Sequence, residues 1–340
     1  MRYVIIGAGA VGGAIGGRLA EAGQDVVLVA RGAHHTALRE HGLTFTTPEG
    51  TRTHRLPVVD RPEALDLRSD DVLLLAVKTQ DSVAALDAWS AQPVRAVEGA
   101  GTGGTAGELL PLVCAQNGVE SERLALRRFR RVYGMCVWLP ATHVEPGTVV
   151  APCAPYTGML HLGRYPAGTD ATAHAIAADL EKGRLLAPVV PDVMRWKYAK
   201  LVANLVNAVD ALTGPAGDEA ADLVGRAKAE GRAVLAAAGI PYTGDEEQAE
   251  ARNGRMAIDP ATGGGHGGGH GGGSSWQSLV RGTGTIEADY LNGEIVLLGR
   301  LHGVPTPVNE TLGRLADAFA RERRPAGSLT VAELTALIDG

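Results

Sequence analysis

Residues 3–12 read YVIIGAGAVG, and this stretch decides the fold of the first half of the chain. The apolar run at 3–6 is typical of a strand that is buried on both faces of a parallel sheet. A glycine-rich turn follows, then a helical pattern that runs to Ala22 and is stopped by Gly23, and then a second apolar run at 26–29. Strand, glycine turn, helix and strand within about 30 residues predict a dinucleotide-binding unit of the Rossmann type.

The glycines of this turn have separate predicted tasks. Gly7 permits the tight turn, Gly9 lets backbone amides approach a pyrophosphate, and Gly12 allows the helix to pack closely on the strand. The start of the helix then presents unpaired N–H groups and a partial positive charge to the phosphates. We therefore expect the cofactor to contact Gly7, Ala8, Gly9, Ala10, Val11 and Gly12.

The end of the second strand indicates which dinucleotide is bound. An NAD enzyme usually has Asp or Glu there, which accepts hydrogen bonds from the ribose 2′-hydroxyl. Here the strand ends in Arg31, with His34 and His35 close behind. A guanidinium cannot accept a hydrogen bond from a hydroxyl, but it pairs well with a 2′-phosphate. We predict NADPH as the cofactor; the alternative is a solvated arginine in a turn.

Two later strands of the first half each end in a polar side chain. An apolar run at 72–77 leads into Lys78, and a predicted strand at 109–115 is followed by Asn117. Ligands of parallel α/β sheets bind beyond the carboxyl ends of the strands. Either residue alone would more often belong to an ordinary turn, but the two together favour a binding site at this edge.

Two segments are rich in glycine. Residues 98–107 (EGAGTGGTAG) look like a flexible connection without chemistry. Residues 263–273 (GGGHGGGHGGG) hold His266 and His270, which are four apart and could bind a transition metal. A structural metal site usually has more ligands and a fixed geometry. We therefore predict a mobile loop and no metal site.

From about Arg195 the pattern becomes helical. Over 196–212, Lys200, Asn204 and Asn207 fall at positions i, i+4 and i+7, which lie on one face of a single helix. Their neighbours are apolar, and an ammonium group and two amides would cost free energy if they were buried without partners. A polar cleft that faces another domain would resolve this conflict; the alternative is an exposed stripe on a surface helix.

Composition and charge narrow the class of protein. The 340 residues fit two domains, and a net charge of −6 without a Lys/Arg run disfavours nucleic-acid and membrane-surface partners. No apolar run approaches the ~20 residues of a membrane span, and the start lacks the pattern of a signal peptide. Cys114, Cys136 and Cys153 include no CxxC pair and predict idle thiols in a reducing compartment. We expect a cytoplasmic protein.

With these residues in view, the chain resembles the ketopantoate reductase (2-dehydropantoate 2-reductase) family over nearly its whole length. The order and spacing of several motifs carry the resemblance: GAGAVG at 7–12, VKTQ at 77–80, QNGV at 116–119, PGTVV at 146–150, KLVAN at 200–204, SSWQ at 274–277, IEADYLNG at 286–293 and GVPTPVN at 303–309. The resemblance implies an α/β N-terminal Rossmann domain with a parallel sheet over 1–190. An all-α C-terminal domain would follow over 191–340.

The resemblance also implies a role for each matching residue. Lys200 resembles the family's catalytic lysine, which polarises the keto oxygen of a 2-oxo acid and donates a proton to it. Asn117 matches an asparagine that touches both cofactor and substrate, and Lys78 matches a cofactor contact. Asn204 and Ser275 match groups that hold the substrate's hydroxyl and carboxylate. Glu287 resembles the acidic residue near the lysine and the nicotinamide ribose.

Three departures from the family's pattern leave the substrate open. Ser278 stands where the family commonly has Asp, and Trp276 replaces a methionine. A substrate-binding asparagine is expected at position 208, where the chain has Ala208 with Asn207 displaced by one. The leading hypothesis is reduction of 2-dehydropantoate to (R)-pantoate in pantothenate biosynthesis. The alternatives are reduction of another carbonyl or imine, and a non-catalytic NADP(H)-binding module. A homodimer is possible, but no pattern identifies it.

Overall fold

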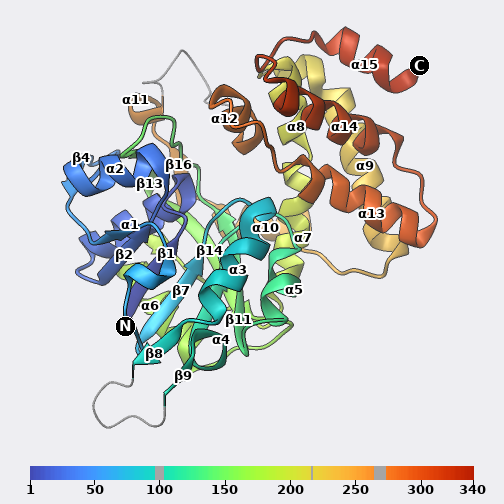
Figure 1. Cartoon of the computed structure of the whole chain (residues 1–340). Coiled ribbons are helices and arrows are strands. Elements are labelled where there is room, and N and C mark those ends of the chain that lie inside the picture. Colours follow the sequence, from blue (N-terminus) through green and yellow to red (C-terminus); the bar gives the residue numbers. More distant parts are fainter. Residues whose placement is uncertain (96–102, 216, 264–272) are drawn as a thin grey trace. The chain divides into compact units, whose positions relative to one another are not determined.

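Strand β1 (Arg2–Ile6) lies inside an eight-stranded sheet, with parallel neighbours β2 (Asp25–Val29) and β7 (Asp71–Leu75) (Figure 1). The computed structural model describes residues 1–95, 103–215, 217–263 and 273–340. The strand order is β15-β14-β11-β10-β7-β1-β2-β5, and every adjacent pair is parallel except β11–β14. The other strands of the sheet are β5 (Val58–Val59), β10 (Pro111–Cys114), β11 (Arg131–Trp138), β14 (Gly158–Arg164) and β15 (Leu185–Leu186). This arrangement confirms the predicted Rossmann-type sheet.

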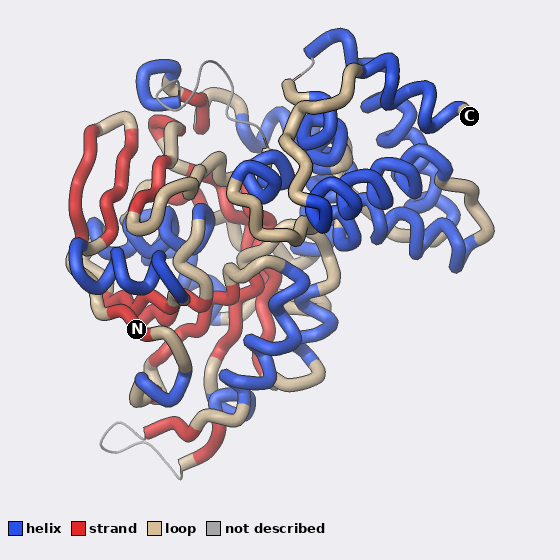
Figure 2. Tube along the Cα trace, turned by 45° about the horizontal axis from the view of Figure 1, so that its top comes forward, coloured by secondary structure: helices blue, strands red, loops and turns tan. Residues whose placement is uncertain are grey.

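Helices cover both faces of this sheet (Figure 2). Successive side chains of a strand point to opposite faces, so Tyr3 and Ile5 pack in one apolar cluster while Val4 and Ile6 pack in another. The first cluster includes residues of α1 (Ala10–Glu21), α2 (Gly32–His41) and α6 (Ala171–Lys182). The second includes residues of α3 (Ser82–Ser90), α4 (Ala106–Leu109) and α5 (Ser121–Leu126).

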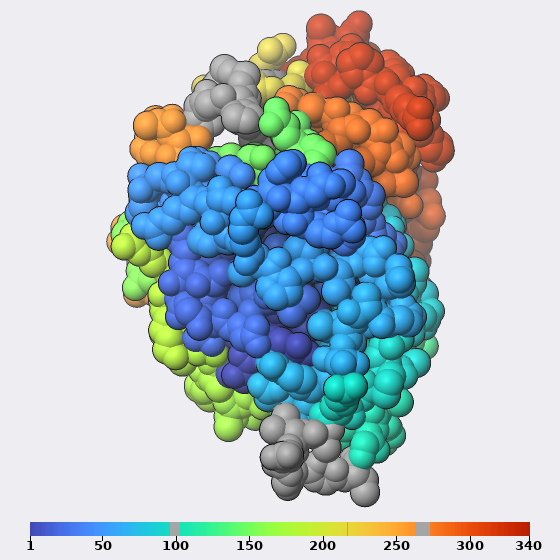
Figure 3. Space-filling model, turned by 60° about the vertical axis from the view of Figure 1, so that its left-hand side comes forward, coloured from blue at the N-terminus to red at the C-terminus, as the bar shows by residue number. Residues whose placement is uncertain are grey.

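All five residues of β1 are buried, which explains why the strand reads as a continuous apolar run after Arg2. In Figure 3 the darkest blue atoms, at the start of the chain, show only in a small area between later segments of the first half. The buried positive charge of Arg2 is compensated, because its guanidinium pairs with the carboxylate of Asp71 at 2.7 Å.

Smaller sheets and short helices complete this part of the chain. The three-stranded sheets are β12 (Thr148–Val150), β3 (Leu43–Thr47) and β4 (Gly50–His54), and β6 (Leu67–Arg68), β8 (Pro93–Arg95) and β9 (Gly104–Thr105). A two-stranded sheet pairs β13 (Cys153–Pro155) with β16 (Met256–Ile258). The short helices are η1 (Pro62–Ala64), η2 (Thr79–Asp81), α10 (Asp245–Arg252) and α11 (Pro260–Gly263).

The chain forms two compact units. The first comprises Met1–Trp196 and Asp245–His266, and the second comprises Lys197–Gly244 and Gly267–Gly340. The sequence predicted a division between residues 190 and 191. The observed division falls later, inside α7 (Val193–Asn204), and the segment with α10 and β16 belongs to the first unit because β16 pairs with β13.

The described residues of the second unit form helices and no strands, which confirms the predicted helical domain. After α7 the helices are α8 (Val206–Thr213), η3 (Gly217–Ala220), α9 (Ala221–Ala237), α12 (Ser274–Val280), η4 (Ala288–Tyr290), α13 (Asn292–His302), α14 (Pro307–Glu322) and α15 (Val331–Asp339). Among the described residues, none of the helices has the length and apolar character that a membrane crossing requires.

Three local expectations need correction. The pattern over 196–212 predicted one helix, whereas α7 ends at Asn204 and α8 begins at Val206. The predicted strand at 109–115 is shorter, because Leu109 ends α4. Within the glycine-rich segment 98–107, residues up to 102 lie outside the described residues, but residues 104–107 form β9 and the start of α4. That helix begins with a capping box between Thr105 and Glu108, so this end of the segment is not the flexible connection predicted.

Candidate functional site

The glycine turn between β1 and α1 has the backbone that a dinucleotide motif needs. Gly7 has a φ of +101°, and a Cβ there would come within 2.7 Å of the Val77 nitrogen. A Cβ at Gly12 would meet the carbonyl oxygen of Gly7 and the side chain of Ile5. By contrast, nothing lies within 4 Å of a Cβ at Gly9, so that side of the turn is open. The open side leaves room for a ligand to approach the backbone.

The hydrogen bonds of the turn show which amides can bind an anion. The N–H groups of Gly7 and Ala8 both donate to the carbonyl of Val29, at 3.1 and 2.9 Å. The N–H groups in the first turn of an α-helix have no partner within the helix. The N-cap residue of α1 is Gly9, which has no side chain to bond the helix amides. The first turn of α1 carries no acidic residue. The positive end of α1 is therefore not neutralised by a carboxylate of its own first turn.

Arg31 and Lys78 both follow strands of the sheet. Arg31 is exposed and is the N-cap residue of α2, directly beyond the end of β2. Lys78 is half-buried and is the N-cap residue of η2, beyond the end of β7. Both positions agree with the predicted edge of the sheet. Their contact with a cofactor stays a prediction.

Asn117 contains a buried polar atom that has no partner among the residues that the structure describes. Its Oδ1 is buried and accepts no hydrogen bond from the described residues. The preceding Gln116 donates to the Val77 carbonyl at 2.8 Å and to the Ser82 hydroxyl at 2.7 Å, which fixes the loop after β10. Leaving a buried acceptor unpaired costs about 1–3 kcal/mol. Together with the open side at Gly9, this acceptor fits a site that a bound dinucleotide completes.

The second unit contains the other predicted site residues. Lys200 is half-buried on α7, and Asn204 ends that helix with only 8% of its surface exposed. The Nδ2 of Asn204 is buried and donates no hydrogen bond to any described residue. As at Asn117, one atom of a buried side-chain amide has no hydrogen-bond partner within the described part of the chain. Such an amide fits a polar ligand group that accepts a hydrogen bond.

The junction between α7 and α8 is held by a network of hydrogen bonds. The Leu205 N–H bonds three residues back to the Val202 carbonyl, and the Leu205 carbonyl accepts from Asn292 Nδ2 at 3.4 Å. The same Nδ2 donates to Asn309 Oδ1 at 3.0 Å, and Asn309 donates to Glu230 at 2.8 Å. Leu205 keeps right-handed helical dihedrals, so the break is local. This buried network supports the turn of chain that carries Asn204.

Asn292 and Asn309 are two buried residues of this network for which the sequence predicted no role. Both are fully buried, and they stand in the motifs IEADYLNG and GVPTPVN. An asparagine beside apolar residues in a predicted helix is the signal that could have identified them, because a buried amide needs partners.

Asn207 and Ser275 lie where α8 meets α12. Asn207 Nδ2 is 3.4 Å from the hydroxyl of Ser274, and a Cβ at Gly273 would come within 2.8 Å of Asn207 Oδ1. Ser275 is buried, with 2% of its surface exposed. The hydroxyl of Ser278 donates to the Ser274 carbonyl at 3.0 Å, one turn back in α12. The structure therefore brings Asn207 to the start of the helix that carries Ser275.

Glu287 is buried as well, with 4% of its surface exposed, and it precedes η4. Its negative charge acts on the guanidinium of Arg281. Burial lowers the pKa of Arg281, and Glu287 opposes that shift. A buried carboxylate in this unit thus has at least one cation within electrostatic reach.

The predicted site residues divide between the two units. The first unit holds the glycine turn, Arg31, Lys78 and Asn117, and the second holds Lys200, Asn204, Asn207, Ser275 and Glu287. Within the described residues, no group of three or more His, Cys, Asp or Glu side chains is placed to hold a metal ion. His266 and His270 lie outside those residues. The three cysteines are buried thiols.

Known relatives agree in family and fold. The 2-dehydropantoate 2-reductase of Mesorhizobium japonicum is 28% identical over 355 residues, covering 95% of this chain and 99% of the relative. A PanE/ApbA family ketopantoate reductase from Ralstonia eutropha JMP134 has a TM-score of 0.74 and 26% identity, covering 95% of this chain and all of that one. D-mandelate dehydrogenase with NADH and anilino(oxo)acetate has a TM-score of 0.76 at 23% identity, covering 96% of this chain and 100% of the other, which shows the shared fold.

Two family models account for most of the sequence. The model described as ketopantoate reductase PanE/ApbA matches residues 3–165, and the model of the C-terminal part of the same family matches residues 192–320. Members of this family are oxidoreductases that use NADPH. The chain therefore belongs to the ketopantoate reductase PanE/ApbA family.

Proposed function

We propose that this protein reduces a 2-oxo acid to a 2-hydroxy acid with NADPH, and that the substrate is 2-dehydropantoate, which becomes (R)-pantoate. One observation carries the proposal: two buried amide atoms, Asn117 Oδ1 and Asn204 Nδ2, have no partner among the described residues. They stand in QNGV and KLVAN, the motifs that the resemblance associates with the ligands. A protein that bound only a dinucleotide would have no need for the second of these amides.

Lys200 is the proposed proton donor. Bound NADPH supplies the hydride for the carbonyl carbon. Hydride attack builds negative charge on the keto oxygen, and an ammonium group close to that oxygen stabilises the charge and then transfers its proton. Glu287 is proposed to keep Lys200 charged and oriented, because a nearby opposite charge favours the ionised form.

The remaining side chains would orient the ligands. Asn117 would contact both cofactor and substrate, while Asn204, Asn207 and Ser275 would hold the hydroxyl and carboxylate of the substrate. Amide and hydroxyl groups can donate to a carboxylate and also accept from a hydroxyl, so one set can fix both ends. Correct placement of a reacting carbonyl is itself a large part of catalysis.

Arg31 supports NADPH over NADH. Arg31 is exposed and is the N-cap residue of α2, at the place where an NAD enzyme usually has a carboxylate. The first turn of α2 carries no acidic residue, so nothing in that turn repels a 2′-phosphate. We propose that Arg31 binds this phosphate, with Lys78 and the residues from Gly7 to Gly12 as further cofactor contacts. A cytoplasmic location and a homodimer stay predictions.

A second candidate is a reductase of a different carbonyl or imine in the same family. Ser278 supports it, because its hydroxyl bonds within its own helix where the family commonly has a carboxylate. The half-buried indole of Trp276 lies next to Ser275 in sequence and would reshape an acid pocket. These departures would affect substrate choice and leave Lys200, Asn117 and Asn204 in place.

The test follows NADPH oxidation with 2-dehydropantoate and with a panel of other 2-oxo acids and imines. Turnover of 2-dehydropantoate supports the first candidate, and turnover of another compound alone supports the second. NADPH binding without turnover of any compound would overturn both in favour of a non-catalytic NADP(H)-binding module.

A further inference from the structure

His34 joins two segments that are far apart in the sequence. It lies in the first turn of α2, and its Nε2 is 2.8 Å from the carbonyl oxygen of Ala8 in the glycine turn. On the other side of the ring, the N–H of Gly147 donates to Nδ1 at 2.9 Å. Gly147 belongs to the PGTVV motif, which the proposed function leaves without a role.

These two bonds define the tautomer of His34. Because Gly147 donates to Nδ1, that nitrogen carries no hydrogen. Because a carbonyl oxygen can only accept, Nε2 must carry the hydrogen and donate it to Ala8. His34 is thus a neutral imidazole that uses both nitrogens. The ring also packs against His143 at 4.1 Å between centroids, and His143 donates from Nδ1 to the Thr148 carbonyl at 3.0 Å.

The turn around Gly147 is built to present its N–H to His34. Gly147 has a φ of +82°, which favours glycine, and a Cβ there would come within 3.1 Å of the Ala37 Cβ on α2. Its carbonyl accepts from the Thr44 N–H at 2.8 Å, which ties the turn to β3. The acceptor side of His34 is therefore held by a part of the fold that is itself fixed.

The bond to Ala8 bears on the cofactor through the geometry of one peptide group. In a trans peptide the C=O of Ala8 and the N–H of Gly9 point in opposite directions. Holding the Ala8 carbonyl toward His34 therefore turns the Gly9 N–H away from α2. Without that bond the peptide between Ala8 and Gly9 can rotate, because glycine has wide conformational freedom.

We propose that His34 is a positioning residue for the cofactor, which locks the Ala8–Gly9 peptide and holds the glycine turn against α2, the helix whose N-cap residue is Arg31. The start of α1 and the guanidinium of Arg31 then keep a fixed spacing for the pyrophosphate and the 2′-phosphate of one dinucleotide. This inference rests on the proposed use of NADPH. It also assigns a role to the PGTVV motif, because the N–H of Gly147 in this motif sets the tautomer of His34.

Replacements of His34 separate its two hydrogen bonds. In His34→Gln the amide nitrogen can take the place of Nε2 and still donate to Ala8. In His34→Asn the amide oxygen can take the place of Nδ1 and accept only from Gly147. His34→Leu makes neither bond. The matched control is His35→Leu, since His35 is the next residue on α2 and is likewise half-buried.

The measurement is the Kd of NADPH, obtained by fluorescence titration of the protein without substrate, with thermal unfolding of each variant alongside. We expect His34→Leu and His34→Asn to bind about tenfold more weakly, as loss of a hydrogen bond to a buried carbonyl implies. His34→Gln and His35→Leu should bind within about twofold of the wild type. At saturating NADPH and substrate, kcat should be unchanged in all four variants, because His34 touches no reacting atom.

The outcomes distinguish this inference from the proposed function. If the wild-type protein fails to bind NADPH, both are overturned. If the wild type binds and His34→Leu binds equally well, only the role of His34 is overturned. The same holds if His34→Gln is as weak as His34→Leu, or if His34→Asn retains full affinity, because the bond to Ala8 would then not be the one that matters.

Discussion

Gln116 donates its side-chain amide to the backbone carbonyl of Val77 at 2.8 Å, and through this bond the loop after β10 is tied to the loop after β7. The same nitrogen reaches the Ser82 hydroxyl at 2.7 Å. The two joined loops carry Asn117 and Lys78, both proposed ligands of the cofactor. Gln116 has no proposed ligand contact of its own, but it joins the two loops that carry Lys78 and Asn117.

Replacing Gln116 tests this connection. Gln116→Leu leaves the Val77 carbonyl and the Ser82 hydroxyl unpaired, which should lower the free energy of unfolding by about 1–3 kcal/mol. The Kd of NADPH should rise as well, because Lys78 and Asn117 lose their common support. Urea unfolding and fluorescence titration measure the two effects. Gln92→Leu is the control, since the Gln92 side-chain amide donates to the Ala88 carbonyl one turn back, at 3.0 Å. Equally small losses of stability and of NADPH affinity in both variants would contradict the prediction.

Removing the ammonium group of Lys200 should affect chemistry more than binding. Lys200→Ala should reduce kcat by about 10²–10⁴, the range for loss of a general acid. The Kd of NADPH in the binary complex should stay near that of the wild type. Steady-state kinetics with the substrate found in the panel and a fluorescence titration provide the two numbers. Lys228→Ala, on α9 of the same unit, serves as the control. A Lys200→Ala variant with near-normal kcat would remove Lys200 from the mechanism.

The choice of cofactor depends on Arg31. Arg31→Ala should weaken NADPH binding by about tenfold or more, because a charge-assisted hydrogen bond to the 2′-phosphate is lost, while NADH binding should change little. The measured quantity is the ratio of the two dissociation constants. Arg39→Ala is the matched control, since Arg39 lies on the same helix with its side chain 64% exposed. An equal loss of affinity for both cofactors would show that Arg31 does not bind the 2′-phosphate.

Acid should destabilise the first unit through His161. Its ring stacks on Trp196 at 3.6 Å, and burial, together with Arg252, lowers its pKa to about 4. An unfolded histidine has a pKa of about 6.5. As the pH falls from 6.5 toward 4, His161 is therefore protonated in the unfolded chain but stays neutral in the folded chain. The free energy of unfolding falls as a result.

His161→Phe keeps an aromatic ring on Trp196 and removes the titration. Between pH 7.5 and 4.5, the wild type should lose about 2 kcal/mol more of its free energy of unfolding than this variant does. Denaturant unfolding at the two pH values measures the difference. His174→Phe, at an exposed position of α6, should behave like the wild type. Parallel losses in the wild type and His161→Phe would show that another group titrates.

Features that depend on nearby residues were accessible from sequence. The glycine turn, its strands and the placement of Arg31 and Asn117 follow from local pattern, because a turn and a strand end are made by consecutive residues. The contact at Leu205 between α7 and α8 was not accessible, since its partner Asn292 is 87 positions away along the chain. The same holds for His34, whose partner Gly147 is 113 positions away. Such pairings form only when the fold brings distant segments together, and no periodicity in either segment records them.

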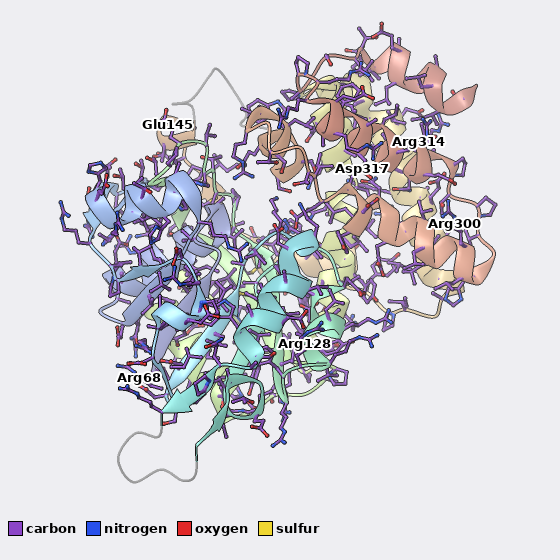
Figure 4. The ribbon with its side chains drawn as sticks, in the orientation of Figure 1. Arg68, Arg128, Glu145, Arg300, Arg314 and Asp317 are labelled. Carbon is purple, nitrogen blue, oxygen red and sulfur yellow. The ribbon has the colours of Figure 1, made fainter. Side chains whose placement is uncertain are left out.

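The second unit should become more stable at neutral and higher pH when one carboxyl group is removed. Asp317 lies on α14, with Arg314 on the same helix and Arg300 on α13 (Figure 4). It lines a groove of about 520 Å³ and shares a hydrogen bond with Asp289. Burial, reinforced by Asp289, raises the pKa of Asp317 to about 7. In the unfolded chain an aspartate has a pKa of about 3.9.

These two pKa values determine how the free energy of unfolding changes with pH. Below pH 4 the carboxyl is protonated in both states and contributes no difference. As the pH rises from 4 to 7, the unfolded chain gains the free energy of ionisation while the folded chain stays protonated, so stability is lost. Asp317→Asn should therefore raise the free energy of unfolding at pH 8 by about 1 kcal/mol, a figure reduced for partial solvent screening, and change it little at pH 4. Urea unfolding at both pH values is the measurement, with Asp222→Asn on α9 as the exposed control. A gain of equal size at pH 4 and pH 8 would mean that the substitution acts through packing, and that the Asp289–Asp317 pair does not hold a proton at neutral pH.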